Sequence, residues 1–451
     1  MHGDKARRIS AWPYSGHDVM TQKDLPRINP LLEISDFDSD AGKPMKLCVL
    51  PRGDGGGEVR FAMPAEYVEI AREFDGTRDI DAVIESYMER RNSDREAAWL
   101  KRLVMQSLMP KGVVIRADQV PEEVAVSSQS NKAFLHIKLP IIKASVVEPI
   151  AKCLGFLFRP TAMVLGLILF IGIHIYAYGF LFRGHHLEFD QLGITSVIVL
   201  MLFSTLATIC HEFGHATAAS HYGCKNMTIG WGLYLIYTVL WTNVSDAWRL
   251  PRRQRAVIDI GGVYFESFFL VAMLLAYQST GNTIYLFGFI FVDLSIANTF
   301  NPFLRMDGYW LVSDIFGIVN LRKQQEIWWQ DVLSWLFTWG RYRPKSTLKK
   351  SAKWVLAIYT VFGTLFIAYV MKTIFEVVVL SVVTNLPTFM GQTWHKLASD
   401  MTWLTVLKAL AEFGWRILVI VGAGLTFWNV GKAILSLITR MRHTALHERS
   451  V

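Results

Sequence analysis

Residues 192–219 read LGITSVIVLMLFSTLATICHEFGHATAA, and this stretch decides the fold. A helix that crosses a bilayer needs about 20 mostly apolar residues. Residues 192–210 form such a run without a charged side chain, and the run then ends in His211, Glu212 and His215. Ionisable groups within or beside a spanning helix are costly to desolvate and usually serve a function. The stretch therefore predicts a membrane helix that carries a functional site at one end.

Other apolar runs in the chain also have the length of a spanning helix. They are residues 161–182, 256–277, 283–304, 354–383 and 403–428. Together with 192–219 they predict a polytopic α-helical membrane protein with about six transmembrane helices.

The composition agrees with a membrane protein. The 451 residues are 52% hydrophobic and 19% charged, with a mean hydropathy of +0.29. An ordinary soluble domain has about 25% charged residues. These values exclude a disordered chain, a collagen-like fibre and a disulfide scaffold. The four cysteines have neither pairing nor metal-binding spacing, so we expect free thiols.

The net charge of +8 has two explanations, nucleic-acid binding and membrane topology. Lys and Arg gather beside the apolar runs, in residues 248–255, in residues 321–353 and in the tail after 432. Cytoplasmic loops of membrane proteins carry such an excess of cations. We therefore expect both termini in the cytoplasm, an integral membrane protein in contact with the lipid bilayer, and no nucleic-acid partner.

The polar and apolar stretches divide the chain into four predicted segments. Residues 1–118 form a small cytoplasmic α+β, winged-helix-like domain, and 119–150 form an irregular connector. Residues 151–320 form a core of about four spans. Residues 321–451 add two further spans and a basic cytoplasmic tail.

Within the N-terminal domain, the pattern predicts strands over 45–49 and 58–63. It predicts helices over 64–74, 80–92 and 93–111. Thr77, Asp79 and Asp81 are candidate caps for the second helix, because short polar side chains satisfy the free N–H groups where a helix begins.

Residues 227–248 read MTIGWGLYLIYTVLWTNVSDAW, which is aromatic and β-branched and favours strands over a helix. An unpaired sheet edge cannot face lipid. We expect a short hairpin or re-entrant loop, sheltered by protein near the cytoplasmic face. A simple linker is the alternative.

The chemistry centres on HEFGH, residues 211–215. Residues i and i+4 share one face of a helix, so His211 and His215 can both reach one Zn²⁺. Glu212 lies beside them, where it can take a proton from a water molecule. The alternative is a polar turn where the helix leaves the bilayer.

A catalytic zinc also needs a third protein ligand and an open position. The acidic candidates are Asp246, Asp259, Glu266, Asp293, Asp307 and Asp314. Asp307 stands out in NPFLRMDGYW, residues 301–310, because Pro302 disturbs a helix and Gly308 permits an unusual backbone. In the predicted topology it leaves the membrane on the same side as the histidines. The alternative is an ordinary turn residue.

Other ionisable groups within the apolar runs have open roles. His174 could approach the zinc site or form a structural hydrogen bond. Asp259, Glu266 and Asp293 could form a proton path or hold helices together.

HEFGH on a spanning helix, followed by NPFLRMDGYW, resembles the site-2 protease family of intramembrane zinc metalloproteases. The longer string resembles the bacterial peptide zinc metalloprotease branch. The resemblance implies that His211, His215 and Asp307 bind Zn²⁺ and that Glu212 is the general base. Asn301 matches the motif asparagine, with a possible role in supporting the substrate or an oxyanion.

The same resemblance covers residues 150–320 and implies further properties. Residues 227–248 match a region that binds a substrate strand, and Gly261, Gly262 and Glu266 loosely match a glycine-rich element. The implied location is the bacterial cytoplasmic membrane. The implied partners are a peptide or transmembrane-segment substrate, peptide-modifying enzymes and an exporter.

The N-terminal domain resembles a PqqD-like peptide recognition element in its two strands, three helices and the stretch FDGTRDIDAVIESY. Such elements bind the leader of a modified peptide by adding it to a sheet edge. A generic winged-helix or regulatory domain is the alternative.

Three functions remain at this point. The first is an intramembrane zinc endopeptidase that cleaves a membrane-associated or ribosomally made, modified peptide precursor. The second is a membrane transporter or export partner for such a peptide, with a structural metal site. The third is a scaffold that presents a peptide to a partner enzyme, in which Glu212 would have no role.

Overall fold

The computed structural model describes residues 25–51, 58–91, 96–119, 121, 137–184, 187, 192–234, 237–340, 348–399 and 401–447. The chain divides into two compact units. The first unit contains Met1–Phe37, Lys43–Ile141 and Gly230–Pro251. The second contains Asp38–Gly42, Ile142–Ile229 and Arg252–Val451.

The first unit is built on antiparallel strands. Strands β2 (Glu33–Phe37), β3 (Met45–Pro51) and β4 (Glu58–Pro64) form a sheet in the order β2-β3-β4. Strands β1 (Pro26–Ile28) and β5 (Val114–Arg116) pair separately. The predictions of β3 and β4 are confirmed, whereas β1, β2 and β5 were not predicted.

The three helices predicted for this domain are present, with shorter bounds. They are α1 (Ala65–Ala71), α2 (Ile80–Arg91) and α3 (Ala97–Leu103), and α3 continues into a π-helical turn over Val104–Leu108. The carboxylate of Asp79 accepts a 2.7 Å hydrogen bond from the N–H of Ala82, so Asp79 is the cap that begins α2. Phe74 and Leu100 are buried in the core of the unit.

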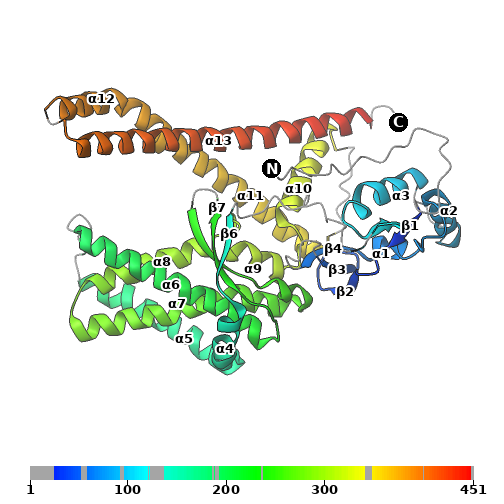
Figure 1. Cartoon of the computed structure of the whole chain (residues 1–451), viewed down its shortest axis with the longest axis horizontal. Coiled ribbons are helices and arrows are strands. Elements are labelled where there is room, and N and C mark those ends of the chain that lie inside the picture. The colour runs from blue at the N-terminus through cyan, green and yellow to red at the C-terminus, as the bar shows by residue number, and fades with distance from the viewer. Residues whose placement is uncertain are drawn as a thin grey trace, which may run out of the picture. The chain divides into compact units, whose positions relative to one another are not determined.

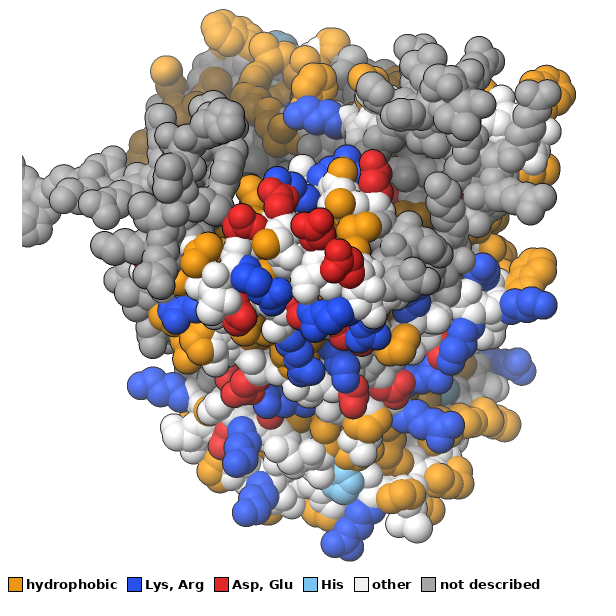
Figure 2. All heavy atoms as spheres, turned by 90° about the vertical axis from the view of Figure 1, so that its right-hand side faces the viewer, with side chains coloured by type: hydrophobic (Ala, Val, Ile, Leu, Met, Phe, Trp, Pro, Cys, Tyr) orange, Lys and Arg blue, Asp and Glu red, His pale blue; other side chains and the backbone are white. Residues whose placement is uncertain are grey.

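The outer surface of this helical layer is mixed in charge. Figure 2 shows acidic and basic side chains interspersed on the face that it presents. The exposed ion pairs of this unit include Lys101–Asp81 and Arg91–Glu69. A surface that alternates both signs suits a domain that faces water.

A third sheet contains the predicted hairpin. Strands β7 (Ile229–Tyr234) and β8 (Tyr237–Thr242) form it, and β6 (Ile137–Ile142) adds a third strand in the order β6-β7-β8. Gly230 permits the close approach, because a Cβ there would lie 2.5 Å from the carbonyl oxygen of Leu139 and 2.3 Å from the ring of Trp241. The hairpin prediction is confirmed.

The predicted irregular connector is wrong over the part that the structure describes. Residues 137–142 form β6, and α4 (Ala144–Leu154) follows it. Pro140 has no N–H to donate to a neighbouring strand, but β6 lies at the edge of its sheet, where a missing N–H is tolerated. Residues 120 and 122–136 of the predicted connector lie outside the described residues.

The second unit is helical (Figure 1). After α4 its helices are α5 (Pro160–Tyr176), α6 (Ile194–His221), α7 (Arg252–Thr280), α8 (Ile284–Thr299), α9 (Asp307–Ile315), α10 (Leu321–Phe337), α11 (Lys350–Thr373), α12 (Ser381–Ser399) and α13 (Trp403–His447). Short π-helical and 3₁₀ turns extend α5 to Gly184.

Some of the described helices are long and apolar enough to cross a membrane. These five are Pro160–Gly184, Ile194–His221, Arg252–Thr280, Lys350–Glu376 and Thr405–Ser436. By length and composition, the fold is therefore compatible with a polytopic helical membrane protein.

Two predictions about the apolar runs need correction. The predicted span 283–304 contains α8, whose 16 residues are shorter than a span, because a turn begins at Asn301. The stretch between the predicted spans 354–383 and 403–428 is not a plain loop, because α12 covers Ser381–Ser399 and contains Pro387 within the helix. A proline inside a helix costs one hydrogen bond and does not always end it.

Helix α7 lies at the centre of the second unit. In the apolar part of α7, 61% of the residues are buried. The corresponding share is 17% in α5 and in α6. It packs on α6 and α8 (Figure 1). The outward residues of α5, such as Leu165 and Ile168, are 66% and 61% exposed, as expected of side chains that face lipid.

Candidate metal centre

The structure brings His211, His215 and Asp307 together. The two histidines lie one turn apart on α6 and are buried, and Asp307 is the first residue of α9. The Oδ2 of Asp307 lies 2.9 Å from Nε2 of His211 and 3.0 Å from Nε2 of His215. The two Nε2 atoms are 3.0 Å apart. The three predicted side chains therefore form one group that could hold a metal ion.

The donor set and its spacing fit Zn²⁺. Two imidazoles and one carboxylate are a known combination in catalytic zinc sites. Around a tetrahedral Zn²⁺ with bonds of about 2.0–2.1 Å, two ligand atoms lie about 3.3 Å apart. The three atoms would therefore separate by only a few tenths of an ångström to accept the ion.

Both imidazoles are held by a second hydrogen bond. The Nδ1–H of His215 donates to the carbonyl oxygen of Ile258 at 2.7 Å. Nδ1 of His211 lies 3.0 Å from Oε2 of Glu266, which is 2% exposed. These partners place the N–H of each neutral ring on Nδ1 and leave the Nε2 lone pair for a cation. The open role of Glu266 is thus resolved as a hydrogen bond to His211.

Glu266→Gln is expected to weaken zinc binding about 10- to 100-fold, because partners of this kind orient the ligand and raise its basicity. Competition with a fluorescent chelator would measure the change. Asp293→Asn is the matched control, since Asp293 contacts His174 rather than His211. Equal zinc affinity in Glu266→Gln and in wild type would show that Glu266 does not support the site.

Glycines let α6 and α7 approach closely enough for these contacts. A Cβ at Gly262 would lie 2.4 Å from Cε1 and Nε2 of the His211 ring. A Cβ at Gly214 would lie 2.1 Å from the carbonyl oxygen of Gly261. Gly262 therefore leaves room for the imidazole ring, and Gly214 and Gly261 let the two helix backbones come close.

The turn before α9 delivers Asp307 to this group. Helix α8 ends at Thr299, and the side-chain oxygen of Asn301 accepts a 3.0 Å hydrogen bond from the N–H of Phe303. A Cβ at Gly308 would lie 2.2 Å from the carbonyl oxygen of Phe300. The hydrogen bond that the structure gives to Asn301 is local, so Asn301 shapes the turn that precedes Asp307.

The charges of α9 are set by their neighbours. Burial raises the pKa of Asp307, but the positive charge of His215 and His211, when these rings are protonated, outweighs burial and lowers the pKa below its usual range. Asp307 is therefore ionised at neutral pH, the form that binds a cation. Asp314 lies seven residues further along α9. Burial raises its pKa, although the charge of Arg255 acts to lower it.

An ion pair anchors the other end of α9. Nε of Arg255, on α7, donates to Oδ1 of Asp314 at 2.8 Å, and a second nitrogen of Arg255 donates to the carbonyl oxygen of Asp38 at 3.2 Å. Both side chains of the Arg255–Asp314 pair are largely buried. Helix α9 is thus fixed to α7 independently of the three grouped side chains.

The remaining candidates lie in other contacts. His174 bonds to Asp293 at 2.9 Å and to the carbonyl oxygen of Phe170 at 2.7 Å, which makes it a structural histidine. Asp246 belongs to the first unit, where it pairs with Arg60 at 3.2 Å. None of these three side chains belongs to the described group of possible metal ligands.

Comparisons of the chain with protein-family models, with curated proteins and with solved structures find no match.

Proposed function

We propose that the protein is an intramembrane zinc endopeptidase. One observation carries the proposal: two imidazole nitrogens and one carboxylate oxygen lie within 3.0 Å of each other, with a buried glutamate next to the first histidine. The group lies towards the end of an apolar helix of 28 residues. Its motifs resemble those of the site-2 protease family.

The chain's own residues have distinct roles in this chemistry. His211, His215 and Asp307 would hold Zn²⁺. When bound, the ion supplies a Lewis acid that polarises a peptide carbonyl and favours deprotonation of water. Glu212 accepts the proton from the attacking water and returns it to the amine that leaves. Glu266 and the carbonyl of Ile258 keep both rings in the tautomer that this role requires.

The site favours catalysis over a structural metal. Structural zinc sites are closed by four protein ligands, whereas catalytic sites keep one position open. Among the described residues, the group contains three ligand side chains. A transporter with a structural metal, or a scaffold, would have no need of Glu212 beside them.

The substrate we propose is a membrane-associated peptide, such as a ribosomally made and modified precursor. Peptide hydrolysis needs a locally extended chain, and an extended chain can pair with a sheet edge. In the order β6-β7-β8, strand β8 is an outer strand. The sheet β2-β3-β4 of the first unit has the outer strands β2 and β4, which supports the PqqD-like interpretation of that domain.

Metal-dependent cleavage tests the proposal. The full chain in lipid vesicles is mixed with a panel of single-span membrane peptides, including any precursor encoded beside its gene. Treatment with 1,10-phenanthroline should reduce cleavage at least about 100-fold, and added Zn²⁺ should restore it. Cleavage that continues after mass spectrometry has shown complete loss of zinc would exclude the mechanism.

Removing the leader from a precursor should raise KM and leave kcat unchanged.

A further inference from the structure

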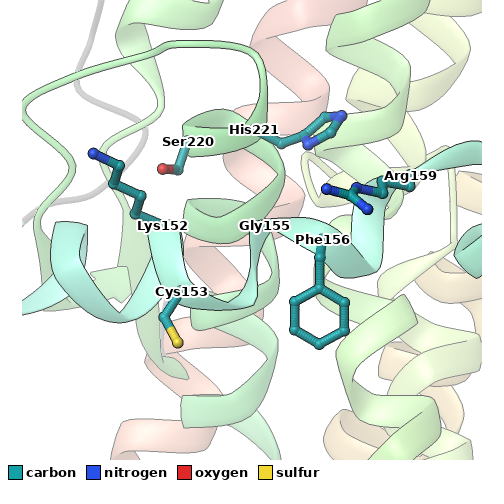
Figure 3. A pocket seen from close by; sticks show the side chains of 7 residues that line it. All are labelled: Lys152, Cys153, Gly155, Phe156, Arg159, Ser220 and His221. Carbon is teal, nitrogen blue, oxygen red and sulfur yellow. The ribbon is translucent and has the colours of Figure 1, made fainter.

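A pocket of about 340 Å³ lies at the C-terminal end of α6, the helix that carries His211 and His215 (Figure 3). Lys152 and Cys153 line it from the end of α4, and Phe156 and Arg159 line it from the stretch between α4 and α5. Ser220 and His221 line it from the end of α6. Its volume is at the lower end of the range of about 300–1,000 Å³ that is usual for small-ligand sites.

The polar groups of this pocket suit an anion. Lys152 and Arg159 are exposed cations, and within the described part of the chain no acidic side chain forms an ion pair with either. Ser220 adds a hydroxyl donor and His221 adds a ring N–H. Two cations and two neutral donors around one cavity match the oxygen atoms of a phosphate group.

The position of the pocket points to a lipid as the source of that phosphate. Arg159 immediately precedes the apolar helix α5, and His221 is the last residue of α6. Two candidate spans therefore change from apolar to polar at this pocket, which is the depth of the headgroups.

Exposed apolar side chains also lie on the elements next to the pocket. Phe156 is 54% exposed in the pocket, and Val164 on α5 is 58% exposed. On α4, Val146 and Ile150 are 51% and 41% exposed. A short helix with an outward apolar face, followed by cations, is typical of a segment that lies in the membrane interface. Acyl chains can cover these side chains while the headgroup enters the pocket.

We propose that this pocket binds the headgroup phosphate of an anionic phospholipid. Lys152 and Arg159 pair with the phosphate, and Ser220 and His221 donate hydrogen bonds to it. The lipid would then link the α4–α5 stretch to the end of α6, six residues or about 9 Å beyond His215. The inference is independent of the peptidase proposal, because it uses no metal ligand.

Cys153 offers a reporter inside the pocket, because it is the exposed cysteine while Cys48, Cys210 and Cys224 are buried or half-buried. The full chain is labelled with a neutral maleimide in vesicles of phosphatidylcholine, with and without phosphatidylglycerol. Phosphatidylglycerol should slow labelling of Cys153 about fivefold or more, as expected for a cationic site on an anionic surface. Inorganic phosphate added to phosphatidylcholine vesicles should give no protection.

Two variants separate the pocket from the general surface charge. In K152Q/R159Q, phosphatidylglycerol should no longer protect Cys153 from labelling, although the position of Cys153 in the fold is unchanged. Arg183→Gln, at the opposite end of α5, is the matched control and should retain it. Protection that persists in K152Q/R159Q overturns the proposal. Equal protection by inorganic phosphate overturns the lipid as the ligand.

Discussion

Replacing Glu212 with glutamine should give a protein that still binds zinc and cleaves peptide about 10²- to 10⁴-fold more slowly than wild type. Glutamine keeps the shape of the side chain but cannot accept a proton from water. Zinc stoichiometry should stay the same, because the described metal group consists of His211, His215 and Asp307. Cleavage assays and metal analysis on the same purified sample would measure both quantities.

Glu376→Gln is the matched control for this change. Glu376 is exposed and pairs with Lys372 at 3.2 Å, and surface pairs of this kind contribute about 0–1 kcal/mol. Its cleavage rate should equal that of wild type. If Glu212→Gln cleaves at the wild-type rate, Glu212 is not the general base and the peptidase mechanism fails.

Asp307→Ala should lower zinc affinity by more than about 100-fold. Loss of a residue that only hydrogen-bonds to a metal ligand already costs about 10- to 100-fold, and Asp307 is itself a proposed ligand. The remaining His211 and His215 form an incomplete site, and cleavage should fall with the zinc content. Zinc bound per chain after dialysis against a weak chelator would measure the loss. Thermal unfolding of the same sample would show that the helices remain folded.

Asp307→Glu is the conservative variant for comparison. It keeps a carboxylate at the start of α9 and should restore part of the zinc affinity that alanine removes. Full zinc occupancy in Asp307→Ala would identify a different acid as the third ligand. Asp259 would then be the first residue to test, because it lies on α7 close enough to interact with both Asp307 and Asp314.

The local parts of the metal group were predictable from the sequence. His211 and His215 are one helical turn apart, so their spacing alone places both rings on one face. Asp307 was identified from Pro302 and Gly308, which mark a broken helix, and the structure places the break there. These inferences need only backbone geometry within a few residues.

The contact of His211 with Glu266 was not predictable in the same way. The two residues are 55 positions apart, and their contact depends on how closely α6 and α7 pack. Gly214 and Gly262 allow that approach, but a glycine in an apolar run does not reveal what it touches. Only the packed structure shows that the missing side chain makes room for the ring.

The fold shows the same division between local and distant information. Hydropathy identified the long helices, and β-branched and aromatic residues identified the hairpin of β7 and β8. Strand β6 was missed, because it pairs with residues about 90 positions away and contains Pro140. The predicted fourth span was too long, because hydropathy does not register the turn at Asn301.

The placement of Asp307 on a separate short helix has a mechanical consequence. His215 and Asp307 are 92 residues apart in the chain, and 3.0 Å separates their side-chain atoms. An ion bound between them would act as a cross-link that closes this long loop, much as a disulfide does. Part of the binding energy of the metal would then hold the tertiary structure together, so that the loaded protein resists unfolding better than the stripped one.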